Sequence, residues 1–164
     1  MRQPALAFRE ALDSDRALVL DSWLASFRNA HAAGLIAMAD WRPVMGPQVV
    51  RLLQRPGVTV LVAYHPGEDS GADAYGWAAV ELRTSRPPLV LYAYTKQPYR
   101  RLGIARRLLE RAGVNLSAEW HYAAKTGVVS KLGDKMARAR WTPLAARYPP
   151  PGARTDGRNT SPLP

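Results

Sequence analysis

The segment LVLYAYTKQPYRRLGIARRLL, residues 89–109, places a hydrophobic strand, a short turn and an amphipathic helix in direct succession. Residues 89–95 are apolar and rich in aromatic side chains, which is typical of a buried strand. From Leu102 onward apolar residues recur at helical spacing, so we expect a helix over 103–112. Gly103 stands at its start, where a glycine lets the backbone approach a ligand closely. The segment predicts a strand–turn–helix unit with room for a bound molecule at the turn.

The turn and the start of the helix combine features that attract an anion. The first N–H groups of a helix have no partner within it and lie at the positive end of its dipole, which favours phosphate. Arg100 and Arg101 add positive charge, and Ala105 has almost no side chain to block the approach. The segment also fits a simpler interpretation, an arginine-rich helix face that contacts a membrane, a nucleic acid or only solvent.

The pattern R-x-x-G-x-A at 100–105, in this strand–turn–helix context, resembles the acetyl-coenzyme A loop of the GNAT N-acetyltransferase superfamily, whose pattern is Q/R-x-x-G-x-G/A. The resemblance covers about residues 5–122 and fades after about Leu116. FREA at 8–11, ahead of Asp15, is similar to the family's first strand and helix start, and YGW at 75–77 resembles the opening of its third strand. In overall style the chain also resembles small acetyltransferases encoded by phages.

The predicted fold class is α+β, a GNAT-like mixed, mostly antiparallel central sheet of about six strands flanked by helices. Asp13 offers an N-cap carboxylate for the first helix, and Pro43 and Pro47 delimit a break before the second. We expect strands over 5–9, 58–64, 74–83, 89–95, 116–122 and 141–148, and helices over 14–30, 48–54, 103–112 and 124–139. We expect one domain over 4–148. The tail 149–164 has five prolines and one large apolar residue, so we expect it to be disordered.

Composition excludes several kinds of protein. The 164-residue chain has no cysteine, which rules out a disulfide framework, a cysteine-based zinc site and a thiol nucleophile. No apolar run reaches the roughly 18–20 residues of a membrane span, and the MRQP start lacks a signal core. We therefore expect no membrane partner and a cytoplasmic location, in the host cell if the chain is phage-encoded. The net charge of +10 favours nucleic acid, acidic protein or an anionic cofactor as a partner.

The resemblance implies direct transfer of an acetyl group from acetyl-CoA, as cosubstrate and without a metal, to a primary amine of a protein, a nucleobase or a small molecule. The diphosphate would lie on the N–H groups of 101–105, and the pantetheine arm on the backbone of Tyr94 and Thr95. A backbone N–H near Ala93 or Tyr94 could stabilise the oxyanion of the tetrahedral intermediate. The expected cofactor-binding residues are Tyr94, Thr95, Lys96, Arg100, Arg101, Leu102, Gly103, Ile104 and Ala105.

Three residues are the candidates for acid–base catalysis: Tyr94, Glu81 and His121. Many family members carry a glutamate early in the strand before the loop, but LVL at 89–91 contains no carboxylate. Glu81 could act through a water, Tyr94 or its strand-face neighbour Tyr92 could reach the thioester, and a histidine such as His121 is a common acid or base. Each also has a structural interpretation: a surface charge at the end of a strand, a packing tyrosine and a hydrogen-bonded structural histidine.

The first two helices and their connection should supply the acceptor side. Trp23 and Phe27 are also spaced as core residues, at i and i+4. Trp41 falls outside any clear periodicity and is a better candidate for a pocket wall. The expected acceptor-pocket residues are Trp23, Ser26, His31 and Trp41.

Two other functions remain as alternatives. The first is a catalytically weak or inactive module of this fold that binds nucleic acid through its basic surface. The second is a host-takeover or inhibitor protein that acts on a macromolecular partner. The sequence leaves the identity of the amine acceptor and the oligomeric state open.

Overall fold

A six-stranded sheet with helices on both faces forms the protein. The structure is a computed structural model that describes residues 5–30, 35–66, 74–124 and 138–142. The pairs β1–β2, β2–β3 and β3–β4 are antiparallel, and the pairs β4–β5 and β5–β6 are parallel, which confirms the predicted α+β class with a mixed sheet. The elements in chain order are β1 (Ala7–Glu10), η1 (Asp13–Asp15), α1 (Arg16–Ala30), α2 (Met38–Leu53), β2 (Val58–Tyr64), β3 (Ala74–Arg83), β4 (Arg86–Thr95), η4 (Gln97–Tyr99), α3 (Ile104–Arg111), β5 (Trp120–Tyr122) and β6 (Ala139–Trp141).

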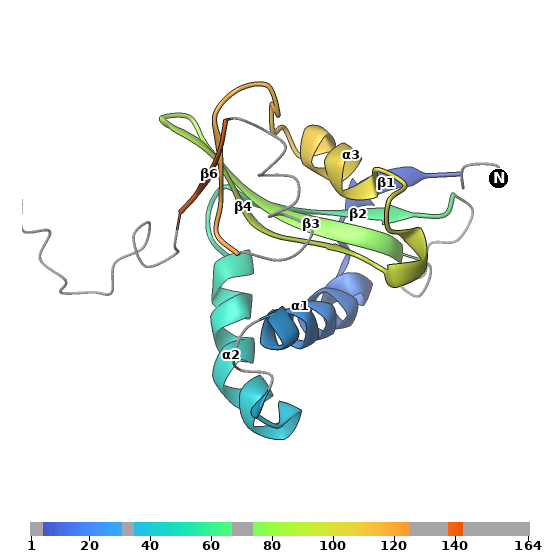
Figure 1. Cartoon of the computed structure of the whole chain (residues 1–164), viewed down its shortest axis with the longest axis vertical. Helices are drawn as coiled ribbons and strands as arrows, with labels where there is room; N and C mark the ends of the chain where they lie inside the picture. Colours follow the sequence, from blue (N-terminus) through green and yellow to red (C-terminus); the bar gives the residue numbers. More distant parts are fainter. Residues whose placement is uncertain (1–4, 31–34, 67–73, 125–137, 143–164) are drawn as a thin grey trace, which may run out of the picture.

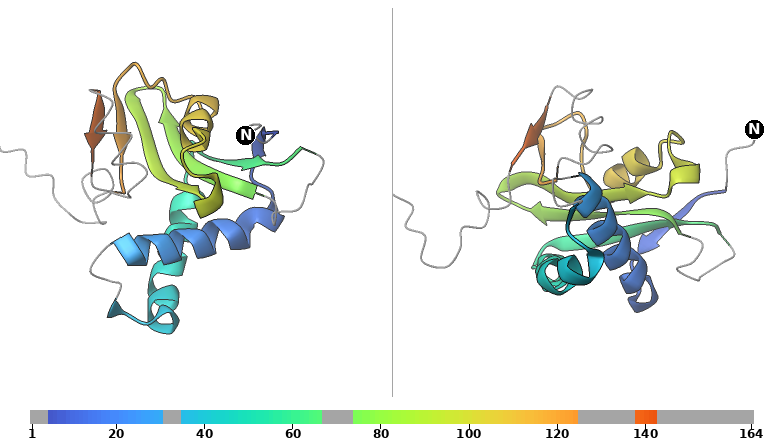
Figure 2. Two further views of the ribbon diagram at one scale, coloured as in Figure 1. Left: turned by 45° about the vertical axis from the view of Figure 1, so that its right-hand side comes forward. Right: turned by 60° about the horizontal axis from the view of Figure 1, so that its bottom comes forward.

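Both faces of the central strands are covered, which explains their almost unbroken apolar sequences. Helices α1 and α2 lie on one face of the sheet and α3 lies on the other (Figures 1 and 2). The strand order is the chain order, β1 to β6. Strands β2 and β3 begin and end where the sequence predicts. The described residues include no helix long and apolar enough to span a membrane.

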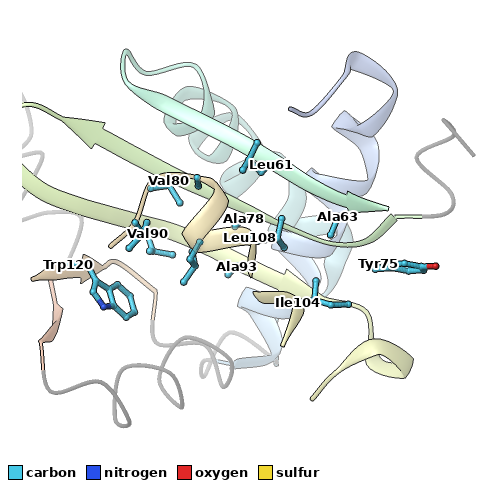
Figure 3. Packing of buried hydrophobic residues seen from close by; sticks show 13 residues of the cluster. Leu61, Ala63, Tyr75, Ala78, Val80, Val90, Ala93, Ile104, Leu108 and Trp120 are labelled. Carbon is cyan, nitrogen blue, oxygen red and sulfur yellow. The ribbon is translucent and has the colours of Figure 1, made fainter. Parts of the chain in front are cut away.

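Helix α3 packs against the sheet through one face. Leu108 and Leu109 are fully buried and Ile104 is nearly so, all three in one cluster with Ala78 and Ala93 of the central strands. Figure 3 shows Leu108 and Ile104 beside these alanines. The alanines leave space for the larger helix residues to pack closely. Each large side chain contributes roughly 1.5–3 kcal/mol by leaving water. This packing fixes where α3 begins, which is beside the end of β4.

An ion pair connects β1 to the start of α1. Arg9 forms a two-pronged contact with Asp15, which is fully buried, and the Leu12 N–H donates to the same carboxylate over 2.8 Å. Burial alone would raise the pKa of the Asp15 carboxyl. The hydrogen bonds from Arg9 and Leu12 outweigh burial and hold this pKa below its usual range. Asp15, and not the predicted Asp13, therefore accepts a backbone N–H at this helix entry.

The predicted break at Pro43 and Pro47 is wrong. Helix α2 runs without interruption through Pro43 and Pro47. Both prolines are exposed, whereas Val49 is buried on the sheet side. The packing of that side against the sheet outweighs the loss of two backbone N–H donors on the solvent side.

Four strand predictions need adjustment. Strand β1 covers Ala7–Glu10 instead of residues 5–9. Strand β4 begins at Arg86 instead of residue 89, because the chain is already extended and paired opposite Arg83. Strand β5 is confined to 120–122, and β6 starts at Ala139, two residues before the expected position. The predicted helix over 124–139 and strand over 141–148 lie mostly outside the described residues, and the tail 149–164 lies wholly outside them.

Replacing Asp15 with asparagine should lower the free energy of unfolding at pH 7 by about 3 kcal/mol, because it leaves Arg9 without its charged partner. Asp15 has a lower pKa in the folded state, so its contribution is fully present above about pH 4 and is lost as the pH falls through the folded pKa. Denaturant unfolding at pH 7 should show a large difference in the free energy of unfolding between the parent protein and Asp15→Asn. The difference should be smaller at pH 3. Asp13→Asn, the same change at an exposed residue, is the control, and an equal effect of the two variants would contradict this role.

Candidate functional site

The turn after β4 is held to its neighbours by backbone and side-chain contacts. The Lys96 N–H donates to the carbonyl of Tyr75 over 2.9 Å, and the Tyr99 ring packs on the Tyr75 ring with centroids 4.3 Å apart. Arg100 Nε donates to the carbonyl of Thr95 over 3.2 Å, so this side chain closes the base of the turn. These contacts attach the turn to β3 at Tyr75 and to the end of β4 at Thr95.

Two residues of this turn have left-handed backbone geometry. Arg101 has φ of 70° and Gly103 has φ of 73°. Such an arrangement directs successive N–H groups into a concavity that binds anions. A Cβ added at Gly103 would meet nothing within 4 Å, so the concavity is open. The left-handed conformation costs a non-glycine residue about 1–3 kcal/mol, which makes Arg101 a locally strained residue at this point.

The start of α3 adds further N–H donors beside the turn. Gly103 is the N-cap, and its carbonyl accepts the first helical hydrogen bond from the Arg107 N–H, over 3.1 Å. The N–H groups of 104–106 thus precede the first helical donor and lie at the positive end of the helix dipole. The turn and helix start together form a cradle suited to a phosphate group.

The edge of β4 next to this cradle carries backbone groups that no described strand pairs with. Thr95 lies opposite Gly76, and the Lys96 N–H donates to Tyr75, so the Thr95 pair is one of the non-hydrogen-bonded pairs of the ladder. Backbone groups of alternate residues face alternate sides, so those of Ala93 and Thr95 face away from β3. Those of Tyr94 face β3, which removes its backbone from the expected pantetheine and oxyanion contacts.

Strand β5 covers only the first part of that edge. It pairs with β4 at Leu89 and Val90, and the Ala123 N–H then donates to the Val90 carbonyl over 2.9 Å. Beyond Val90, the described part of the chain pairs no strand with this edge of β4. An extended ligand could therefore add to the sheet there, as a peptide does in strand addition.

A pocket opens where β5 leaves β4. It has a volume of about 240 Å³ and lies between helices α1 and α2, the middle of β4 and the segment after β5. Leu91 lines it from β4, about 13 Å along the strand from Thr95 at about 3.3 Å per residue. The described lining residues are Trp23, Phe27, Met45, Gln48, Val49, Leu52, Leu91, Ala123, Ala124 and Trp141.

The three candidate catalytic residues do not lie together. Tyr94 is partly buried at the cradle end of β4, and its ring lies 6.5 Å from that of Trp77. Glu81 is four residues from Trp77 along β3, at the far end of the sheet and about 13 Å away. His121 lies opposite Leu89 on β5, at that same far end. The register separates Glu81 and His121 from the cradle.

Both distant residues have structural contacts. Glu81 is fully buried and forms an ion pair with Arg83, so its interpretation as an exposed charge is wrong. His121 contacts the Glu119 carboxylate over 3.0 Å and the Thr142 hydroxyl over 2.9 Å. The second contact holds Thr142, the residue after β6, to β5.

The expected acceptor residues divide into three groups. Trp23 lines the pocket. Trp41 stacks on Phe27 with ring centroids 6.1 Å apart and so supports the pocket wall from behind. Ser26 instead contacts the Tyr92 hydroxyl over 2.7 Å. His31 lies outside the described residues.

The sequence analysis expected the second helix to contribute to the pocket but did not name the α2 residues that line it. Met45, Gln48, Val49 and Leu52 follow one another at helical spacing and line one wall. That spacing was visible in the sequence, but Pro43 and Pro47 led to the prediction of a break instead. The described residues include no cluster of side chains able to hold a metal ion.

Tyr92 lies at the centre of the interface between α1 and the sheet. Its ring stacks on Trp23 with centroids 4.7 Å apart. Burial raises the pKa of its hydroxyl to about 12, despite the hydrogen bond with Ser26, so it stays protonated near neutral pH. Alongside it, Trp77 Nε1 donates to the Ser22 hydroxyl over 2.8 Å. These contacts fix α1, and with it one wall of the pocket.

No protein-family model matches the sequence, and no curated protein matches it. Three solved structures share the fold: a predicted acetyltransferase from Clostridium acetobutylicum with acetyl-CoA (14% identity, TM-score 0.56, 80% of this chain and 88% of that one), an acetyl transferase from Pyrococcus furiosus (14%, 0.53, 79% and 91%) and a GCN5-related N-acetyltransferase from Rhodopseudomonas palustris (17%, 0.52, 82% and 82%). At this identity the likeness concerns the fold alone. The chain spans less than two thirds of two GNAT-family acetyltransferases that it also matches, 63% of one from Staphylococcus aureus and 62% of one from Desulfovibrio desulfuricans.

Replacing Ser26 with alanine should destabilise the protein by about 1–3 kcal/mol, because it leaves the buried Tyr92 hydroxyl without a partner. Removing both hydroxyls, in Ser26→Ala with Tyr92→Phe, should cost less than the sum of the two single changes. Denaturant unfolding of all four proteins measures this coupling. Strictly additive costs would contradict a structural role for Ser26.

Proposed function

We propose that this chain, which has the fold of the GNAT N-acetyltransferases, transfers the acetyl group of acetyl-CoA to a primary amine. The observation that carries the proposal is the open anion cradle at 101–106 beside the edge of β4 that no described strand covers. A diphosphate followed by an extended chain of amides is the kind of ligand that fits such a pair of features. The C. acetobutylicum neighbour was solved with acetyl-CoA, which agrees with this ligand.

The cosubstrate would bind in two parts. The diphosphate would accept hydrogen bonds from N–H groups between Leu102 and Arg106, with Arg101 exposed nearby to add charge. The pantetheine arm would extend along β4 from Thr95 towards Leu91. The Thr95 N–H is available for it, whereas the Thr95 carbonyl already accepts from Arg100.

The acetyl transfer would be direct. The amine nitrogen attacks the thioester carbonyl carbon, a C–N bond forms, and the oxygen becomes an oxyanion near the Ala93 N–H. The C–S bond then breaks, the thiolate takes up a proton, and the amine nitrogen loses one. The products are an acetamide and coenzyme A with a free thiol.

Tyr94 is the residue we assign to the proton transfer to sulfur. Of the three candidates it alone lies at the end of the sheet that holds the cradle. No carboxylate or imidazole is among the described residues that line the pocket, so water would carry the proton from the amine. The acceptor would then react as its neutral amine.

Replacing Gly103 with glutamate should weaken acetyl-CoA binding by at least about 100-fold, roughly 2.7 kcal/mol, because it places a carboxylate at the diphosphate. Isothermal titration measures the dissociation constant. Gly103→Ala is the matched control, since it imposes the same backbone strain without the charge and its Cβ enters open space. The control should bind within a few-fold of the parent. Absence of binding by the parent at millimolar acetyl-CoA would refute the proposed function.

Replacing Tyr94 with phenylalanine should lower kcat by about 100-fold, the usual contribution of a positioned acid, with little change in acetyl-CoA affinity. Glu81→Gln and His121→Gln should leave kcat nearly unchanged per folded molecule, because both residues lie at the far end of the sheet. Steady-state kinetics on folded fractions separates these effects. A large loss of kcat in His121→Gln with Tyr94→Phe active would overturn the assignment.

A further inference from the structure

The pocket beside β4 is lined almost entirely by apolar side chains. Three aromatic rings, those of Trp23, Phe27 and Trp141, contribute to its wall. Among the described lining residues, Gln48 on α2 carries a polar side-chain amide. Gln48 is exposed at the helix surface. Ligand pockets of this kind bind an apolar body and use few polar groups to orient it.

The size of the pocket limits what can enter it. A cavity of about 150 Å³ lined by apolar residues can hold one benzene ring. The 240 Å³ found here would therefore accommodate one ring and a short alkyl chain. A sugar or a nucleoside would bring several hydroxyl groups against a wall that offers few hydrogen-bond partners, and each unpaired group would cost free energy.

Charge argues against a polycationic acceptor. The chain carries a net charge of +10, and the described lining contains no aspartate or glutamate. A polyamine would place additional ammonium groups near this wall without a carboxylate to pair with them. An amine with a single basic nitrogen avoids that cost, because its nitrogen must be neutral when it attacks.

The pocket also has the right position for the acceptor. Leu91 lines it, and the Ala93 N–H assigned to the oxyanion lies only two residues further along β4, about 7 Å away. A ligand with its ring between Trp23 and Leu91 could therefore direct a short amine-bearing chain towards the thioester.

We propose that the acceptor is a small monoamine with an aromatic or branched aliphatic body, held in the pocket between α1, α2 and β4. This inference rests on the proposed function for the transfer step, but binding of the apolar body does not need acetyl-CoA. 2-Phenylethylamine represents this class, and spermidine represents the polycationic class.

The test compares two tryptophan substitutions on neighbouring residues of α2. Met45→Trp should fill the pocket, because Met45 lines it. Val44→Trp is the matched control, because Val44 is 60% exposed and is not among the lining residues. Titration with 2-phenylethylamine should show at least about tenfold weaker binding to Met45→Trp and unchanged binding to Val44→Trp, a difference of about 1.4 kcal/mol. Thermal melts should confirm that both variants fold.

Mass spectrometry after incubation with acetyl-CoA supplies the second readout. We expect acetylated 2-phenylethylamine in clear excess over acetylated spermidine, with Gly103→Glu still binding the amine but no longer acetylating it. Preferential acetylation of spermidine, or equal amine binding by the two tryptophan variants, would overturn the inference while leaving the proposed function intact. Amine binding without any acetyl-CoA binding would instead refute the proposed function and retain the pocket.

Discussion

Within the part of the chain that the structure describes, strand β4 has strand neighbours on both sides only up to Val90, where β5 leaves it. Backbone N–H and C=O groups in proteins are almost always bonded, so a strand edge left open inside a fold is available for a ligand. The register sends the backbone groups of Ala93 and Thr95 to that edge. The turn that follows ends in the left-handed Gly103, so the phosphate cradle lies in line with the open edge. Both parts of the proposed binding site, the open edge of β4 and the phosphate cradle, depend on the point at which β5 leaves β4.

The rest of the molecule holds that geometry in place. Helix α3 is fixed on one face by Leu108 and Leu109, and α1 is fixed on the other by Trp23 and Tyr92. The hydroxyl groups in this second interface are engaged with one another, as in the contact between Ser26 and Tyr92. Their role is to position α1, which leaves the pocket itself with an apolar wall. Arginines on the exposed side of α3 contribute to the positive charge of the protein. This charge supports the alternative function, nucleic-acid binding.

The sequence predicted the elements whose pattern is local. Strands β2 and β3 and the turn before α3 were predicted because periodicity and Gly103 mark them directly. The continuity of α2 was missed, since the packing of Val49 that overrides Pro43 and Pro47 is a tertiary effect. The register of β4 with β3 could not be predicted from the sequence either. Whether a backbone group of Tyr94 or of Ala93 faces the ligand depends on pairing with β3, and the same pairing places Glu81 far from the cradle.

Backbone amide NMR during titration with acetyl-CoA tests the binding geometry most directly. Signals of 102–106, Ala93 and Thr95 should shift strongly and saturate together, because these N–H groups would meet the diphosphate and the extended arm. The Tyr94 amide, which pairs with β3, should move much less than its two neighbours. Saturating shifts confined to other parts of the sheet, with 102–106 unmoved, would contradict the account.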